Sequence, residues 1–159
     1  MSAPRERPVF VVCEDGREYT DRFERTLGGT FAFVRAGCFE DARALLAARL
    51  CAGILLDLDF RRTPVGDLVD ERGGRSPARS DEARHRLATV QGILVLQALR
   101  AAGVAAPALL FADLDDGEQV SFLETTLAPL TVVSSRRGLN EMAALMSRMA
   151  GGAGGPAAR

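Results

Sequence analysis

Lysine is absent from this chain of 159 residues, so all twenty basic residues are arginine. Any chemistry that requires a lysine ammonium is therefore excluded. Tryptophan is also absent, and His85 is the only histidine. A single histidine within a charged loop does not provide the serine, histidine and acid set of a hydrolase. No glycine-rich phosphate-binding motif follows the first apolar run. We therefore expect a protein that is not an enzyme.

The chain has neither a large excess of one charge sign nor a long apolar run. The net charge at pH 7 is −1, so no global field attracts nucleic acid or a membrane surface. No apolar run approaches the roughly 18 residues of a membrane span, and the first residues lack the apolar core of a secretory signal. The three cysteines lack CxxC spacing and are expected to be reduced thiols. We expect a cytoplasmic protein with no nucleic-acid partner and no membrane partner.

Short apolar runs alternate with helical patterns along most of the chain. The runs predict strands at residues 9–12, 30–34, 52–60, 107–111 and 130–133. The intervening patterns predict helices at residues 17–27, 39–50, 90–103, 118–127 and 140–149. Five consecutive strand-helix units predict an α/β fold, with a doubly wound, five-stranded parallel sheet and helices on both faces.

One connection is much longer than the others. Residues 61–89 separate the third strand from the third helix, whereas about two to six residues usually suffice. Their proline, glycine, serine, arginine and acid content favours a solvated insertion loop, with a short helix capped by Ser80. We expect one domain over residues 1–150. The glycine-rich residues 151–159 are expected to form a flexible tail.

Acidic residues follow two of the predicted strands. Glu14 and Asp15 come directly after the first strand, and Asp57 and Asp59 end the third. In an open parallel sheet, functional groups gather beyond the carboxyl ends of the strands, so strand order 2-1-3-4-5 brings these acids together. Clustered carboxylates repel one another unless a cation neutralises them. Mg²⁺ is the only cofactor to which these residues point.

Three stretches of the sequence resemble the receiver domain of bacterial response regulators, the flavodoxin-like fold of the chemotaxis regulators. They are VVCED at residues 11–15, ILLDLDF at residues 54–60 and QGILVLQALRAAG at residues 91–103. The resemblance extends over about residues 7–150, apart from the insertion. It implies a signalling module with strand order 2-1-3-4-5.

The resemblance also implies roles for individual acids. Asp57 falls at the phosphoacceptor position, whose carboxylate attacks a phosphohistidine donor and becomes an acyl phosphate. Glu14 and Asp15 fall at or beside the acidic pair that binds Mg²⁺, with Cys13 as an alternative occupant of the first of those two places. Asp59 lies where the family uses a backbone carbonyl as a metal ligand.

The switch positions depart from the family pattern. Ala112 stands where the family has a threonine or serine hydroxyl, and Ser134, Ser135, Arg136 and Arg137 occupy the neighbourhood of the family's lysine. Residues 130–133 also lack the expected aromatic. Without these groups, phosphorylation has little differential effect on two conformational states. These departures favour an atypical receiver, or pseudo-receiver.

Three functions are compatible with this sequence. The first is a stand-alone receiver-like module of a bacterial two-component pathway that acts by protein contacts, without ordinary aspartyl phosphorylation. The resemblance implies that its protein partner, or a second copy of the chain, docks on the face formed by residues 118–127, 130–133 and 140–149. The second is a conventional receiver in which Asp57 accepts phosphate and an arginine replaces the lysine. The third is a small-molecule-binding flavodoxin-like domain with the insertion as a lid.

Overall fold

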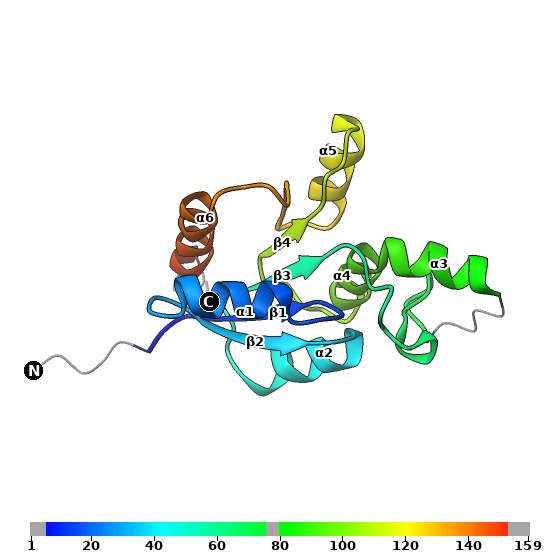
Figure 1. Cartoon of the computed structure of the whole chain (residues 1–159), viewed down its shortest axis with the longest axis horizontal. Helices are drawn as coiled ribbons and strands as arrows, with labels where there is room; N and C mark the ends of the chain where they lie inside the picture. The colour runs from blue at the N-terminus through cyan, green and yellow to red at the C-terminus, as the bar shows by residue number, and fades with distance from the viewer. Residues whose placement is uncertain (1–5, 76–79, 153–159) are drawn as a thin grey trace, which may run out of the picture.

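Five parallel strands form one sheet in the order β2-β1-β3-β4-β5 (Figure 1). The computed structural model describes residues 6–75 and 80–152. The strands are β1 (Val9–Cys13), β2 (Ala32–Ala36), β3 (Gly53–Asp57), β4 (Ala108–Phe111) and β5 (Leu130–Val133). Each neighbouring pair is parallel. The predicted α/β class and the strand order are confirmed.

Helices cover both faces of the sheet. They are α1 (Glu18–Leu27), α2 (Phe39–Ala48), α3 (Asp81–Thr89), α4 (Gln91–Ala101), α5 (Gly117–Thr126) and α6 (Leu139–Gly152), with a 3₁₀ turn η1 (Val65–Asp67). Residues of α1 and α6 form one apolar cluster with the sheet, and residues of α2 and α4 contribute to the other. Within the described part of the chain, no helix is both long and apolar enough to cross a bilayer.

The central strands are apolar throughout because both of their faces are buried. In β1, Phe10 and Val12 pack into the cluster with α1 and α6. Val11 and Cys13 pack into the cluster on the opposite face. This alternation follows from the two-residue period of a strand. It explains why the sequence shows continuous apolar runs rather than an apolar-polar pattern.

Most predicted boundaries lie within two residues of the observed ones, whereas β3 ends three residues earlier than predicted, at Asp57, and α6 ends three residues later. Strand β2 begins two residues later than expected, because the backbone N–H groups of Thr30 and Phe31 both donate to the carbonyl of Leu27 and extend the turn after α1. Helix α6 continues to Gly152, two residues past the predicted domain end at residue 150, so residues 151 and 152 of the predicted tail are helical. The remaining tail, residues 153–159, lies outside the described residues.

Most residues of the first part of the insertion are exposed, but Leu68 and Val69 anchor it to the core. Leu68 and Val69 are buried in the apolar cluster that contains α4. The Gln91 side chain accepts a hydrogen bond from Val69 N at 2.7 Å and donates one to Val69 O at 3.0 Å. The Gln91 amide thus provides hydrogen-bond partners for the backbone N–H and carbonyl of Val69, which burial has removed from water. The composition of the segment did not predict this anchor, because only two apolar residues, Leu68 and Val69, form it.

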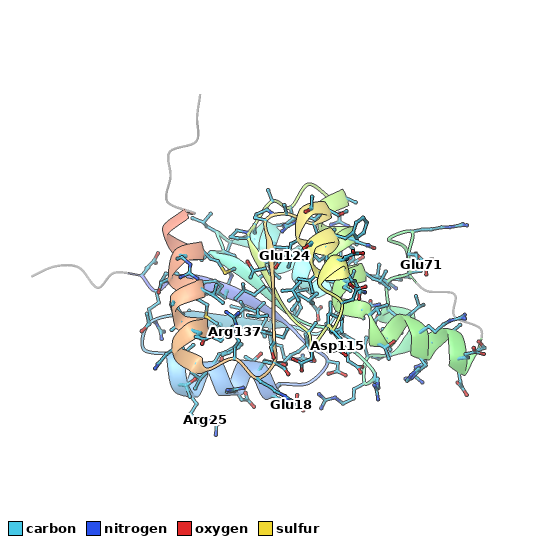
Figure 2. All side chains as sticks on the ribbon, turned by 90° about the horizontal axis from the view of Figure 1, so that it is seen from above. Glu18, Arg25, Glu71, Asp115, Glu124 and Arg137 are labelled. Carbon is cyan, nitrogen blue, oxygen red and sulfur yellow. The ribbon has the colours of Figure 1, made fainter. Side chains whose placement is uncertain are left out.

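The second part of the insertion contains the helix predicted after Ser80. The Ser80 hydroxyl oxygen accepts a hydrogen bond from Ala83 N at 3.1 Å, as an N-cap does. Helix α3 projects beyond the carboxyl ends of the strands (Figure 1). In Figure 2, Glu71 of the insertion lies on the opposite side of the molecule from Arg25 of α1. Residues 76–79, which belong to the same segment, lie outside the described residues.

Candidate functional site

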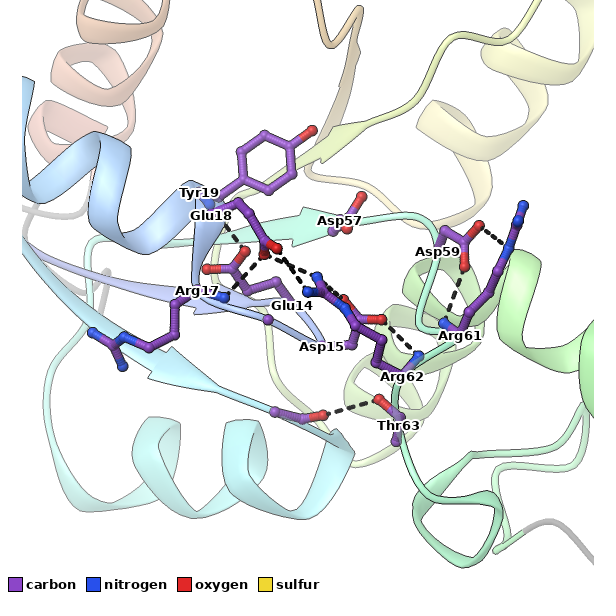
Figure 3. A network of polar contacts seen from close by, with 12 residues as sticks. Glu14, Asp15, Arg17, Glu18, Tyr19, Asp57, Asp59, Arg61, Arg62 and Thr63 are labelled. Carbon is purple, nitrogen blue, oxygen red and sulfur yellow. Dashed lines mark hydrogen bonds and ion pairs between the residues drawn. The ribbon is translucent and has the colours of Figure 1, made fainter.

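The acids that follow β1 and β3 meet at one edge of the sheet. Strands β1 and β3 are direct neighbours, with Cys13 opposite Leu56, so Glu14 and Asp15 lie beside Asp57 (Figure 3). The predicted convergence of these acids at the carboxyl ends of the strands is confirmed. Their side chains, however, do not point toward a common centre.

Glu14 is turned into the protein. Its carboxylate accepts hydrogen bonds from Tyr19 N at 3.0 Å, Thr20 N at 2.8 Å and the Thr20 hydroxyl at 2.6 Å. The residue is only 1% exposed. These N–H groups belong to the first turn of α1, which has no side-chain cap from Arg17 at its N-cap position. The Glu14 carboxylate therefore satisfies the start of the helix, and it is not available to a metal ion.

Arg62 supplies the cation for this acidic edge. Its guanidinium bonds Asp15 Oδ1 at 2.9 Å and reaches both oxygens of Glu18, at 2.7 and 2.9 Å (Figure 3). The backbone N–H of Arg62 also donates to Asp15 Oδ2 at 2.8 Å. The hydrogen bonds from Arg62 lower the pKa of Glu18 to about 2. The two carboxylates likewise raise the pKa of Arg62.

Asp57 stands apart from this network. Its Oδ1 atom accepts a hydrogen bond from the backbone N–H of Leu58 at 2.8 Å, and within residues 6–75 and 80–152 it has no ion pair. Partial burial, assisted by the nearby charge of Asp15, raises the pKa of Asp57 to about 6. A carboxylate of this kind is a competent nucleophile only above that pH.

Helix α4 begins directly against the end of β3. The Gly92 N–H donates to the carbonyl of Leu58 at 3.0 Å, and a Cβ atom at Gly92 would collide with the carbonyl of Asp57. Glycine is therefore required here by the close approach of two backbones. This contact explains the glycine in the stretch QGILVLQ, and it holds the backbone of Asp57 in place.

The side chains implied for a Mg²⁺ site do not converge in the described residues. Asp59 pairs with Arg61, whose Nε lies 2.7 Å from Asp59 Oδ2, so its side chain is directed away from Asp57 (Figure 3). In residues 6–75 and 80–152, no group of three or more histidine, cysteine, aspartate or glutamate side chains could hold a metal ion. Of the three side chains predicted to bind Mg²⁺, those of Glu14 and Asp15 are used by internal contacts and only that of Asp57 is not. The pair with Arg61 involves the Asp59 side chain and not the backbone carbonyl that the resemblance assigns to the metal.

The predicted switch positions are occupied by an acid-hydroxyl cluster. Ala112 is buried at the end of β4 and offers only a methyl group. The next residue, Asp113, accepts hydrogen bonds from the Ser134 hydroxyl at 2.7 Å, from Ser135 N at 3.2 Å and from the Ser135 hydroxyl. Hydrogen bonds from Ser134 and then Ser135 lower the pKa of Asp113. Both serine hydroxyls are therefore used by a carboxylate of the same chain.

The arginines after β5 are arranged differently from a phosphate-binding lysine. Arg137 Nε lies 3.3 Å from Glu141 Oε2, and Figure 2 shows Arg137 beside α6. The charge of Arg136 contributes, as a minor cause, to the lowered pKa of Asp113. One arginine thus pairs with the following helix, and the other acts on Asp113.

Besides Glu18 and Asp113, sequence reasoning missed two further residues at this edge, Tyr19 and Arg62. Tyr19 stacks on Phe111, the last residue of β4, with ring centroids 4.8 Å apart and planes inclined by 12°. Burial raises the pKa of Tyr19 to about 12, so the phenol stays protonated. The sequence did contain a feature that could have identified Arg62. A pair of arginines directly follows the acidic end of β3, in a chain without lysine.

Comparisons with known proteins define the fold. No known family model matches this chain, and no curated protein matches it. Solved structures do match. The signal receiver domain of a putative Luxo repressor protein from Vibrio parahaemolyticus has a TM-score of 0.65 and 11% identity, covering 92% of each chain.

Two further structures agree with that match. The receiver domain of the Francisella response regulator 1452 has a TM-score of 0.64 and 13% identity, covering 91% of this chain and 97% of that one. The Vibrio cholerae chemotaxis protein CheY4 has a TM-score of 0.62 and 12% identity, covering 90% and 98%. At such identities the likeness establishes the fold alone. This chain therefore has the fold of the receiver domains of two-component response regulators.

Proposed function

We propose that this chain is a receiver-like signalling module of a bacterial two-component pathway, acting through protein contacts and not through ordinary aspartyl phosphorylation. In this proposal it is a pseudo-receiver in the cytoplasm, without catalytic activity of its own. It needs no metal, and it binds neither nucleic acid nor a membrane. Its receiver fold presents surfaces to partners, whereas the acidic edge serves as internal structure.

The ion pairs of Arg62 with Asp15 and Glu18 carry this proposal. Transfer of a phosphoryl group to an aspartate relies on cations that neutralise the charge on the transferring oxygens. Here the guanidinium is already bonded to two carboxylates of the chain. The chain has no lysine to supply a second cation. An added phosphoryl group would therefore meet an edge whose positive charge is already used.

The Asp113 cluster also argues against phosphorylation of Asp57. In the structural relatives' fold the end of β4 lies beside the end of β3, and here Phe111 pairs with Asp57 in register. Asp113 follows Phe111 by two residues and carries a negative charge. A carboxylate near this edge repels a dianionic phosphoryl group. Its two serine partners are already engaged, so they offer no free hydroxyl to sense phosphate.

The face formed by α5, β5 and α6 is the proposed partner surface. Phe122 of α5 is 66% exposed, which is unusual for a large aromatic side chain. Strand β5 is an edge strand, but Glu124 accepts a hydrogen bond from Val132 N at 3.0 Å. This contact blocks part of the edge against pairing with another strand. A protein partner, or a second copy of the chain, is therefore expected to dock through side chains.

The second candidate, a conventional receiver, has one observation in its favour. Asp57 lies at the end of β3, is only partly buried and has no ion pair in the described residues, which is the arrangement that a phosphoacceptor needs. A small-molecule-binding role at this same edge is the third candidate. It predicts a bound compound that native mass spectrometry of the purified protein would detect.

Incubation with acetyl phosphate, with and without Mg²⁺, distinguishes these candidates. We expect intact-mass spectrometry to show no added phosphoryl group in the wild-type chain, and the same result for Asp57→Ala. Hydroxylamine treatment serves as a second check, because it releases acyl phosphates. A stable adduct that disappears in Asp57→Ala and changes the oligomeric state would contradict the proposal and support the conventional receiver.

A further inference from the structure

An open groove of about 850 Å³ lies at the end of the sheet opposite Asp57. It is formed by the end of α2, by the residues that immediately precede β3, β4 and β5, and by the end of α6. Strands of a parallel sheet all begin at the same end, so this groove is remote from the acidic edge and from α3 (Figure 1). Its size is within the range of pockets that hold small molecules.

Aliphatic side chains form most of the groove. Leu46, Val104 and Met149 line it from three different elements, and each is partly buried against the apolar core. Leu50 also lines the groove and is 88% exposed, the most exposed of the large apolar residues in the described chain. Covering such an exposed apolar side chain with a ligand lowers the free energy, because apolar surface leaves water.

Three arginines surround this apolar surface, and no acid lines it. Arg43, Arg49 and Arg148 come from α2, from its C-terminal end and from α6, and all three are exposed. Within residues 6–75 and 80–152, none of them forms an ion pair. The chain as a whole has 21 acids for its 20 basic residues. Three cations around one groove without an acid are therefore a local excess of positive charge.

We propose that this groove binds a small amphiphilic anion, with an apolar body and a carboxylate or similar oxyanion head. The body would cover Leu50 and contact Leu46, Val104 and Met149. The head would accept hydrogen bonds from the guanidinium groups, whose planar geometry suits a carboxylate. The site is independent of the proposed signalling function, because it shares no residue with the acidic edge or with Phe122.

The chain's own C-terminal residues complement the groove poorly. Gly152 lines the groove, and residues 153–159, AGGPAAR, follow it directly. These residues include no large apolar side chain, so the apolar surface that covers Leu50 must come from outside this segment.

Titration of the full chain with decanoate tests the proposal, by calorimetry and by backbone amide chemical shifts. We expect saturable one-to-one binding, with shifts confined to the groove and an affinity about tenfold higher than that for uncharged decanol. The triple variant Arg43→Gln, Arg49→Gln and Arg148→Gln should lose about tenfold or more in decanoate affinity while its binding of decanol stays unchanged. Leu50→Asp should weaken the binding of both compounds.

A matched control uses exposed arginines elsewhere. The triple variant Arg22→Gln, Arg25→Gln and Arg86→Gln removes the same charge at exposed positions of α1 and α3 and should bind decanoate like the wild-type chain. Absence of saturable binding, or equal binding by the triple variant, would overturn the proposal. Binding that appears only after deletion of residues 153–159 would also overturn it, by identifying those residues as the occupant. So would tighter binding of an acidic peptide than of decanoate.

Discussion

Arg62 Nη2 lies 2.9 Å from Asp15 Oδ1 and 2.9 Å from Glu18 Oε2, so one guanidinium links the segment after β3 to the start of α1. The same residue donates its backbone N–H to Asp15. A guanidinium bonded to two carboxylates offsets part of the negative charge that the sheet brings together. The acidic edge therefore has an internal cation, while Asp57 forms no ion pair within residues 6–75 and 80–152.

Removal of this guanidinium should create affinity for a divalent cation. In Arg62→Gln, Asp15 and Glu18 lose their partner while their carboxylates stay close together. We expect Mn²⁺ binding, measured by electron paramagnetic resonance, to strengthen about tenfold or more over the wild-type chain. Arg61→Gln is the matched control, since Arg61 pairs with Asp59 alone and its loss should leave Mn²⁺ binding unchanged. Wild-type binding as tight as that of Arg62→Gln would refute the prediction.

The raised pKa of Asp57 makes the unfolding free energy depend on pH. Its pKa is about 6 in the folded chain and near 3.8 in the unfolded one, so the folded state binds the proton more tightly. The stabilisation from this proton is complete below the unfolded pKa and is lost as pH rises through about 6. Asp57→Asn avoids this loss. At pH 7 the variant should be more stable than the wild type by about 1–2 kcal/mol, after allowance for partial exposure.

Urea unfolding at several pH values measures this effect. The difference between Asp57→Asn and the wild-type chain should shrink steadily from pH 7 to pH 4. Asp59→Asn is a suitable control, because Asp59 lies on the same segment but pairs with Arg61, whereas Asp57 has no ion pair in the described residues. A difference independent of pH would show that Asp57 does not titrate in this range.

Gln91 should hold the insertion against α4. In Gln91→Leu, both the N–H and the carbonyl of Val69 lose their hydrogen-bond partner in a buried position. We expect the free energy of unfolding to fall by about 1–3 kcal/mol. Trypsin, which cleaves after arginine, should also cut the segment between Arg72 and Arg86 faster. Gln97→Leu makes the same replacement at an exposed position of α4 and should change neither measurement.

Arg100 is a structural cation without an acidic partner in the described residues. Its guanidinium donates hydrogen bonds of 2.7–3.1 Å to four backbone carbonyls, those of Val104, Ala106, Leu127 and Pro129. Partial burial lowers its pKa. These carbonyls belong to the loops that precede β4 and β5, so one side chain joins two connections at the same end of the sheet.

Loss of these four hydrogen bonds should destabilise the fold. Arg100→Met keeps the aliphatic length but leaves the carbonyls without a donor, and the free energy of unfolding should fall by about 2–4 kcal/mol. Arg100→Lys should recover only part of this loss, since an ammonium has three donors on a single atom. Arg25→Met, at an exposed position of α1, should stay close to the wild type. Equal stability of Arg100→Met and Arg25→Met would contradict the structural role of Arg100.

Much of the fold was predictable because its signals are local. An apolar run such as VFVV has the length and composition of a buried strand, and the helix patterns around Phe23 and Met142 each repeat within a few turns. The predicted start of α3 after Ser80 was correct for the same reason, since an N-cap acts on the next turn. The position of Asp57 at the end of β3 followed directly from where its apolar run stops.

The contacts of the acidic residues were not predictable in this way. Arg62 bonds Asp15 and Glu18 across separations of 47 and 44 residues, and Gln91 reaches Val69 across 22. The sequence by itself determined the order of the strands and helices and placed the acids at strand ends, because hydrophobic period and capping act over a few residues. Only the tertiary structure decided which cation meets which acid, because that depends on how the connections between strands pack at the edge of the sheet.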